Sequence, residues 1–175
     1  MVARFGTRCV CEAFFARNVV LVESDSELAV LVRQDDIFKI AGVDLAVVRD
    51  TTVVSCGAEW TIVPIARLLT AFGVQVRVIH DVDRKGKTDA DLATDEKHEF
   101  HANQRILDVV GDGKCLAIED TFEDVLSTAA NPFSSSKDMP YRASCRIREL
   151  CEGRADLNHA PRLKSVLEFA YRPFA

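Results

Sequence analysis

The sequence has little of what marks a membrane-spanning or disulfide-stabilised protein. Its longest apolar runs, such as residues 19–22 and 28–32, are far shorter than the ~20 residues of a transmembrane helix. The six cysteines include no Cys-x-x-Cys pair, and a chain of this length can bury an adequate core without disulfides. Charged residues interrupt the apolar residues near the N-terminus, whereas a secretory signal has a continuous apolar region there. We therefore expect a cytoplasmic protein with reduced cysteines and no membrane partner.

Glycine and proline are also scarce, at 8 and 5 residues, which excludes collagen-like and low-complexity proteins. Hydrophobic residues make up 48% and charged residues 28% of the chain, a balance that permits a buried core and argues against disorder. Its 175 residues amount to about one domain. We expect a single structural domain, with a core in residues 1–136 and a helical segment in residues 137–175 packed on it.

An excess of positive charge is missing as well, since the net charge is −5. Taken alone, this disfavours nucleic acid, because phosphate binding depends on Lys and Arg. The charge is unevenly spread, however, with a balance of −8 in residues 1–136 and +3 in residues 137–175. Arg142, Arg146 and Arg148 lie near one another on a predicted helix, and they form either a DNA-backbone footprint or an ordinary solvated face.

Short β-branched runs alternate with helical patterns along the chain. We expect strands at residues 19–22, over part of 45–55 with a turn at 49–51 that interrupts it, at 74–79 and at 114–118. We expect helices at residues 26–40, 62–72, 100–110, 122–126, 141–151 and 162–170, with an exposed loop at 84–96. This alternation predicts βαβ units. The expected fold is therefore α/β and Rossmann-like, in three layers around a central, mostly parallel sheet, with a C-terminal helical extension.

Carboxylates follow three of the four predicted strands, on the edge where a parallel sheet gathers its ligands. They are Glu23 after the first strand with Glu27 four residues on, Asp81 and Asp83 after the third, and Glu119, Asp120 and Glu123 after the fourth. Crowded carboxylates repel one another unless a cation neutralises them, and hard cations such as Mg²⁺ or Mn²⁺ prefer oxygen ligands. The alternative is that each is a solvated residue at a loop or helix start.

The order of these motifs resembles the Toprim domain of OLD-family (overcoming lysogenization defect) nucleases. The resembling pieces are Phe14-Phe15-Ala16 with Val19-Val20-Leu21-Val22-Glu23 and Glu27, Ser55-Cys56-Gly57, Phe72-Gly73, Val78-Ile79-His80-Asp81-Val82-Asp83, Asn103 to Ile106, and Thr121-Phe122-Glu123-Asp124-Val125-Leu126. The resemblance covers roughly residues 12–145. It implies a Toprim-like fold, with the catalytic core in residues 1–136, and cleavage of DNA by two divalent cations.

The same resemblance implies a role for individual residues. Glu23, Asp81 and Lys137 would be catalytic, with Lys137 stabilising charge on the scissile phosphate. The metal ligands would be Glu23, Glu27, Asp81, Asp83, Thr121 and Glu123, holding two Mg²⁺ or Mn²⁺ ions. DNA would be the substrate, and the partner an ATPase domain or a separate ATPase subunit, through which the protein could form a homo-oligomer. The implied setting is phage defence or DNA repair.

Two departures from the family keep other interpretations open. Ser24 stands where Toprim proteins usually have glycine after the first Glu, and Lys137 is not directly followed by proline. A catalytically degenerate module that binds DNA or a partner is one alternative, and a phosphatase-like phosphoester hydrolase using Asp81-x-Asp83 is another. His80 could orient a water or phosphate, or could simply be a neighbour of the acidic pair.

Overall fold

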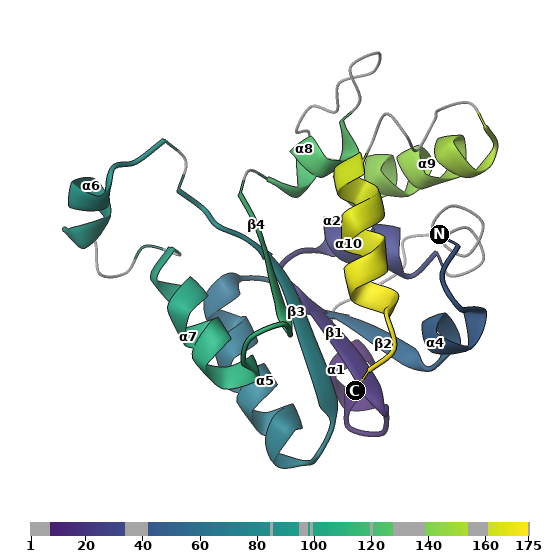
Figure 1. The fold of residues 1–175 in the computed structure, drawn as a ribbon, viewed down its shortest axis with the longest axis horizontal. Helices are drawn as coiled ribbons and strands as arrows, with labels where there is room; N and C mark the ends of the chain where they lie inside the picture. Colours follow the sequence, from purple (N-terminus) through teal and green to yellow (C-terminus); the bar gives the residue numbers. More distant parts are fainter. Residues whose placement is uncertain are drawn as a thin grey trace.

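The computed structural model describes residues 8–33, 42–84, 86–94, 98, 100–119, 121–127, 139–153 and 161–174. Within these ranges four strands form one sheet in the order β2-β1-β3-β4, and every neighbouring pair is parallel (Figure 1). The strands are β1 (Asn18–Val22), β2 (Thr51–Ser55), β3 (Gln75–Asp81) and β4 (Cys115–Ile118). The predicted α/β fold around a parallel sheet is confirmed.

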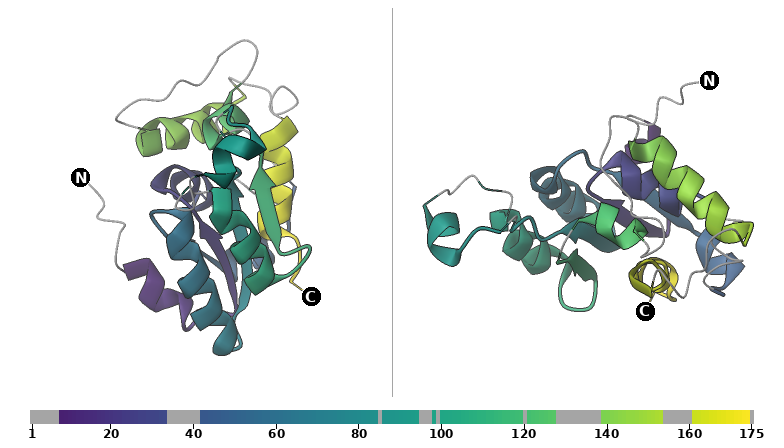
Figure 2. Two further views of the ribbon diagram at one scale, coloured as in Figure 1. Left: turned by 90° about the vertical axis from the view of Figure 1, so that its left-hand side faces the viewer. Right: turned by 90° about the horizontal axis from the view of Figure 1, so that it is seen from above.

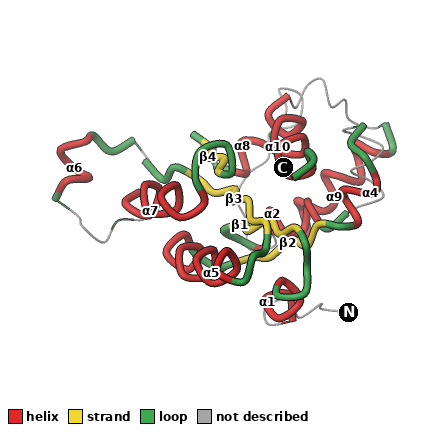
Figure 3. Tube along the Cα trace, turned by 60° about the horizontal axis from the view of Figure 1, so that its bottom comes forward, coloured by secondary structure: helices red, strands yellow, loops and turns green. Residues whose placement is uncertain are grey.

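Helices cover both faces of the sheet, because successive strand residues point to opposite sides. In the central strand, Val20 and Val22 belong to one buried cluster, whereas Val19 and Leu21 belong to the other. The first cluster lies under α2 (Asp25–Leu31), α8 (Phe122–Leu126), α9 (Met139–Cys151) and α10 (Pro161–Tyr171). The second lies under α1 (Arg8–Ala13), α5 (Glu59–Ala71) and α7 (Phe100–Val110) (Figure 3). The three predicted layers are therefore present.

Three segments differ from the sequence expectation. Residues 45–49 form helix α4 (Leu45–Arg49) instead of part of a strand, because the Asp44 carboxylate caps it by accepting from the Ala46 N–H at 2.8 Å. Helix α2 ends at Leu31, short of the predicted residue 40, and residues 34–41 lie outside the described ranges. Helix α5 begins at Glu59, earlier than the predicted residue 62.

The predicted loop at residues 84–96 contains one more helix, α6 (Asp89–Ala93). Thr88 and Asp91 form a capping box at its start, in which the Asp91 carboxylate accepts from the Thr88 N–H at 2.9 Å. This helix projects away from the sheet in the views of Figures 1 and 2. None of the helices in the described ranges is both long and apolar enough to cross a bilayer.

Two buried arginines hold the C-terminal helices in place. Arg77 on β3 donates to the main-chain carbonyls of Arg172 at 2.7 Å and Pro173 at 2.8 Å, just past the end of α10. Arg146 on α9 donates through Nε to the Leu126 carbonyl at 3.1 Å and is only 4% exposed. Arg146 therefore cannot belong to the predicted DNA-backbone footprint, because its guanidinium serves to join α9 to α8.

Candidate metal centre

Carboxylates from every strand end meet at the carboxyl edge of the sheet. Glu23 follows β1 and Asp81 is the last residue of β3, with Asp83 two residues beyond it. Glu27 lies on α2 and Glu123 on α8, which follow β1 and β4. Parallel strands place these ends side by side, so residues distant in the sequence become neighbours.

One group consists of Glu23, Glu59 and Asp83, whose carboxylates each offer an oxygen within 4.8 Å of the others. Glu59 is fully buried and Asp83 is 7% exposed. The sequence reasoning missed Glu59, which opens α5 four residues after β2 ends. The strand-end rule that selected the other carboxylates would have found it, had the second strand been treated like the other three.

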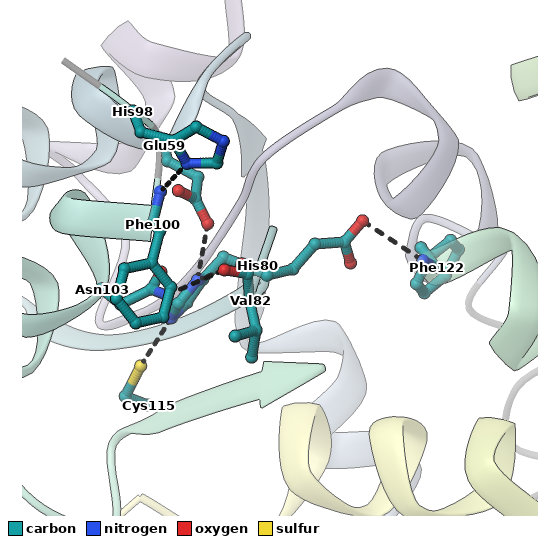
Figure 4. Close-up of polar contacts among 9 residues, drawn as sticks. Glu59, His80, Val82, His98, Phe100, Asn103, Cys115 and Phe122 are labelled. Carbon is teal, nitrogen blue, oxygen red and sulfur yellow. Dashed lines mark hydrogen bonds and ion pairs between the residues drawn. The ribbon is translucent and has the colours of Figure 1, made fainter. Parts of the chain in front are cut away.

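The backbone between the two aspartates directs them to different neighbours. Asp81 ends the extended strand, but Asp83 has φ of +55°, in the left-handed region. Val82 between them is fixed on both sides, since its N–H donates to the Ile118 carbonyl at 2.8 Å and its carbonyl accepts from Asn103 Nδ2 at 3.0 Å (Figure 4). Asp83 thus joins Glu23 and Glu59, and Asp81 does not.

Asp81 lies outside that set of neighbouring oxygens, and the charges of Glu27, Glu23 and Glu123 act on it. Asp81, Glu27 and Glu123 form a second group through this electrostatic interaction. Its Oδ2 accepts from the N–H of Phe122, the first residue of α8, at 3.3 Å. Glu27 is 2% exposed and accepts a hydrogen bond from the Ser24 hydroxyl. The two groups are connected, because Glu23 also acts electrostatically on Asp81.

Burial and mutual repulsion make these carboxylates reluctant to ionise without a cation. Burial, followed by the charges of Glu59 and Glu27, raises the pKa of Glu23 to about 7. Burial, followed by the charges of Glu27 and Glu23, raises the pKa of Asp81 to about 8. Burial also raises the pKa of Glu27, against the hydrogen bond from Ser24. A divalent cation would reverse this preference, because it stabilises the ionised form of its ligands.

The donor set fits hard divalent cations. Glu23 Oε2 and Asp81 Oδ1 are buried and have no hydrogen-bond partner among the described residues. Buried polar atoms normally have a partner, so each such atom calls for an explanation. Mg²⁺ and Mn²⁺ take carboxylate oxygens as ligands. Cations held between the carboxylates would supply the missing partners of these two atoms.

His80 lies behind the first group and does not face solvent, being 1% exposed. Its Nδ1 is 2.9 Å from Glu59 Oε1, and its Nε2 is 3.2 Å from Cys115 Sγ (Figure 4). Burial by itself would lower the pKa of His80, but the hydrogen bonds to Cys115 and Glu59 outweigh it and raise the pKa to about 10. A direct contact of His80 with a substrate phosphate is excluded by this burial.

Two other predicted site residues stand apart from the carboxylate groups. Thr121 precedes α8, and its hydroxyl donates to the Asp124 carboxylate at 3.0 Å, an interaction within the start of that helix. Lys137 lies outside the described residues. Their assignment to the metal shell and to the scissile phosphate therefore depends on the family resemblance.

Ser24 does not need the conformational freedom of the glycine that the family carries there. Its φ of −124° and ψ of 172° are extended backbone, and its hydroxyl caps α2 by accepting from the Ser26 N–H at 3.1 Å. We therefore expect Ser24→Ala to lower the free energy of unfolding by about 1 kcal/mol, and Ser24→Gly by only about a few tenths. Urea unfolding measures both values. A Ser24→Gly variant more stable than the wild type would contradict an unstrained serine.

A parallel α/β sheet whose carboxyl edge gathers buried carboxylates defines a class of metal-binding domains. Residues 14–83 match the family model described as overcoming lysogenization defect protein-like, TOPRIM domain, which confirms the resemblance over that range. The matched range includes Glu23, Glu27, Glu59, Asp81 and Asp83. The match and the group of Glu23, Glu59 and Asp83 together point to a nuclease-type metal-binding module in this part of the chain. A comparison with curated proteins found no match.

Proposed function

We propose that the protein is an endodeoxyribonuclease that depends on Mg²⁺ or Mn²⁺ and nicks or cuts DNA. The observation that carries this proposal is the pair of connected carboxylate groups at the sheet edge, where oxygens of Glu23 and Asp81 have no hydrogen-bond partner within the part of the chain that the structure describes. The match of residues 14–83 to a TOPRIM domain supports it, because that family is associated with metal-dependent cleavage of nucleic acid.

The residues divide the work of the site between them. Glu23, Glu59 and Asp83, whose carboxylate oxygens lie within 4.8 Å of one another, would hold one cation. The family resemblance and the charge interactions of Asp81 with Glu27 and Glu123 favour these three as ligands of the second. Two such cations supply an activated water and charge stabilisation at the leaving oxygen. The buried carboxylates contribute a fixed geometry, since helix starts and strand ends hold them in place. Lys137 would add a positive charge near the scissile phosphate.

The biological context extends this proposal. OLD-family proteins combine the Toprim domain with an ATPase, so we propose that an ATPase domain or subunit works with this chain and mediates any homo-oligomer. Phage defence or DNA repair is the corresponding setting.

Incubation of the purified chain with supercoiled plasmid tests the activity. Relaxed or linear DNA is expected with Mn²⁺ or Mg²⁺ and not with EDTA. Glu23→Gln should abolish cleavage, because it removes a charge from the ligand that links the two groups. Metal binding without cleavage, with or without an added ATPase, would overturn the nuclease proposal in favour of a degenerate binding module. Faster turnover of a small phosphoester would favour the phosphatase-like alternative.

The affinity for metal is expected to rise with pH. Glu23 and Asp81, with pKa values raised to about 7 and about 8, hold protons that a cation must displace. Titrations with Mn²⁺ should therefore give tighter binding at about pH 8 than at about pH 6. Because these pKa values are higher in the folded than in the unfolded chain, the metal-free fold should lose stability as the pH rises through this range. An affinity that is flat or falls with pH contradicts this assignment.

A further inference from the structure

A line of three side chains, the buried His80 and Glu59 and the half-buried Cys115, runs behind the first carboxylate group. Cys115, the first residue of β4, contacts His80 on β3, and His80 contacts Glu59 at the start of α5. The distances are 3.2 Å from Cys115 Sγ to Nε2 and 2.9 Å from Nδ1 to Glu59 Oε1 (Figure 4). His80 is 1% exposed and Glu59 is fully buried, so water does not compete for these hydrogen bonds.

The two oxygen atoms near Nδ1 of His80 show that this ring nitrogen carries a hydrogen. Nδ1 lies 2.9 Å from Glu59 Oε1 and also 2.9 Å from the Asp81 carbonyl oxygen. Both of these atoms can only accept when Glu59 is ionised, so Nδ1 must be the donor. The imidazole is fixed in turn on its other side by the Cys115 thiol. His80 thus presents a fixed N–H to one oxygen of Glu59.

The position of Glu59 makes this contact consequential. It is the first residue of α5, and its N-cap neighbour Ala58 has no side chain that could cap the helix. A glutamate in that place has three rotatable side-chain torsions, so the direction of its carboxylate depends on the groups that contact it. Carboxylates that bind metals are commonly oriented by a hydrogen bond from an outer partner. His80 is such a partner.

We propose that His80 is a positioning residue of the metal centre, which holds the Glu59 carboxylate in place as the third ligand beside Glu23 and Asp83. His80 acts through Glu59 and touches neither metal nor DNA. Cys115 keeps the imidazole in the orientation that this requires. The inference rests on the metal centre of the proposed function, and it adds the residue that orients one of the ligands of that centre, Glu59.

Binding of Mn²⁺ to the full chain, measured by calorimetry without DNA, tests the inference. His80→Leu removes the donor and should weaken Mn²⁺ binding about 10- to 100-fold, as loss of an outer partner usually does. His80→Asn can keep a donor near the position of Nδ1 and should recover most of the affinity. His101→Leu is the matched control, because His101 contacts the Leu92 carbonyl on α6 and should leave binding unchanged. Thermal unfolding in EDTA shows whether each variant is folded.

A double-mutant cycle separates positioning from a merely structural role. Glu59→Gln keeps an acceptor for His80 but removes the ligand charge, so it should weaken Mn²⁺ binding. If His80 acts through Glu59, the double variant should bind no more weakly than Glu59→Gln alone. Additive losses would overturn the inference. Should His80→Leu not fold, His80→Met replaces it in the same cycle.

Glu23→Gln distinguishes failure of the inference from failure of the proposed function. If Glu23→Gln loses Mn²⁺ while folded His80→Leu binds it like the wild type, the positioning role is wrong and the metal centre stands. If the wild type and Glu23→Gln bind Mn²⁺ equally, or neither binds it, the metal centre is wrong and the role of His80 fails with it.

Discussion

Asp81→Asn is expected to lower metal-dependent plasmid cleavage by about 100-fold or more, because a lost ligand should cost at least as much as a lost outer partner. The same substitution should leave the metal-free fold as stable as the wild type, or more stable. Asp81 lies among Glu23, Glu27 and Glu123, and repulsion from these charges contributes to its raised pKa of about 8. An amide removes that repulsion. Its oxygen can still accept from the Phe122 N–H, now 3.3 Å from Asp81 Oδ2.

A large loss of cleavage, combined with an unchanged or higher stability of the metal-free fold, identifies a carboxylate that serves function. Replacing a residue that stabilises the fold lowers the stability of the protein. Replacing a ligand that neighbouring charges repel does not, because the substitution removes a repulsion that destabilises the metal-free state. Thermal unfolding with EDTA and with Mn²⁺ measures this directly. The wild type should gain stability from Mn²⁺ by mass action, and Asp81→Asn should gain much less.

Asp108→Asn is the matched control for this experiment. Asp108 is exposed on α7, where its carboxylate accepts from Gln104 Nε2 at 2.8 Å, one turn away on the same helix. Cleavage and the stabilisation by Mn²⁺ should both stay at the wild-type level in this variant. If Asp81→Asn also behaved like the wild type, Asp81 would have no place in the metal centre.

Arg77→Met is expected to lower the free energy of unfolding by about 2–4 kcal/mol, because it removes a buried charged donor from several main-chain carbonyls. Arg77 is 4% exposed on the central part of the sheet. Its guanidinium donates to the carbonyls of Phe169, Arg172 and Pro173, at 3.2, 2.7 and 2.8 Å. It also lies over the Phe174 ring, 3.7 Å from the centroid. Methionine fills some of the space but satisfies none of these carbonyls.

Urea unfolding measures the loss, and Arg105→Met is the matched control. The Arg105 guanidinium lies 5.3 Å from the centroid of the Trp60 ring but is exposed to solvent. Its replacement should cost about 1 kcal/mol or less, the range of exposed cation–π contacts. Equal losses in the two variants would mean that the carbonyl contacts of Arg77 contribute little. Proteolysis should also remove the C-terminal helix from Arg77→Met more readily, because Arg77 joins the end of α10 to β3.

The local sequence pattern predicted an element correctly where residues of that element and its immediate neighbours stabilise it. Helix α7 has the predicted bounds, because its apolar residues Ala102, Ile106 and Val110 recur at helical spacing and Gly111 follows its last residue. Pattern failed at residues 45–49, whose apolar and β-branched residues indicated a strand. There the Asp44 cap and the burial of Val48 stabilise a helix of one turn, and neither effect is visible in hydrophobic periodicity.

The candidate site was predictable to the extent that it follows from strand ends. Glu23, Asp81 and Asp83 could be placed at one sheet edge because the carboxyl ends of parallel strands meet there. Their division into two groups could not be predicted, since it depends on the positive φ of Asp83 and on the contacts that fix Val82. The place of His80 beside the acidic pair makes it a candidate contact for a water or phosphate, whereas its burial in the structure shows that it faces inwards.

What the sequence determined by itself is the alternation of strands and helices and the acidic residues at the strand ends, because both depend on neighbours within a few positions. The tertiary structure alone decided which carboxylates share an electrostatic environment and which side chains support them. Glu59, His80 and Cys115 come from three separate elements and meet only when β3, β4 and α5 pack together. Desolvation and repulsion, which raise the pKa values of Glu23 and Asp81, arise only through that packing.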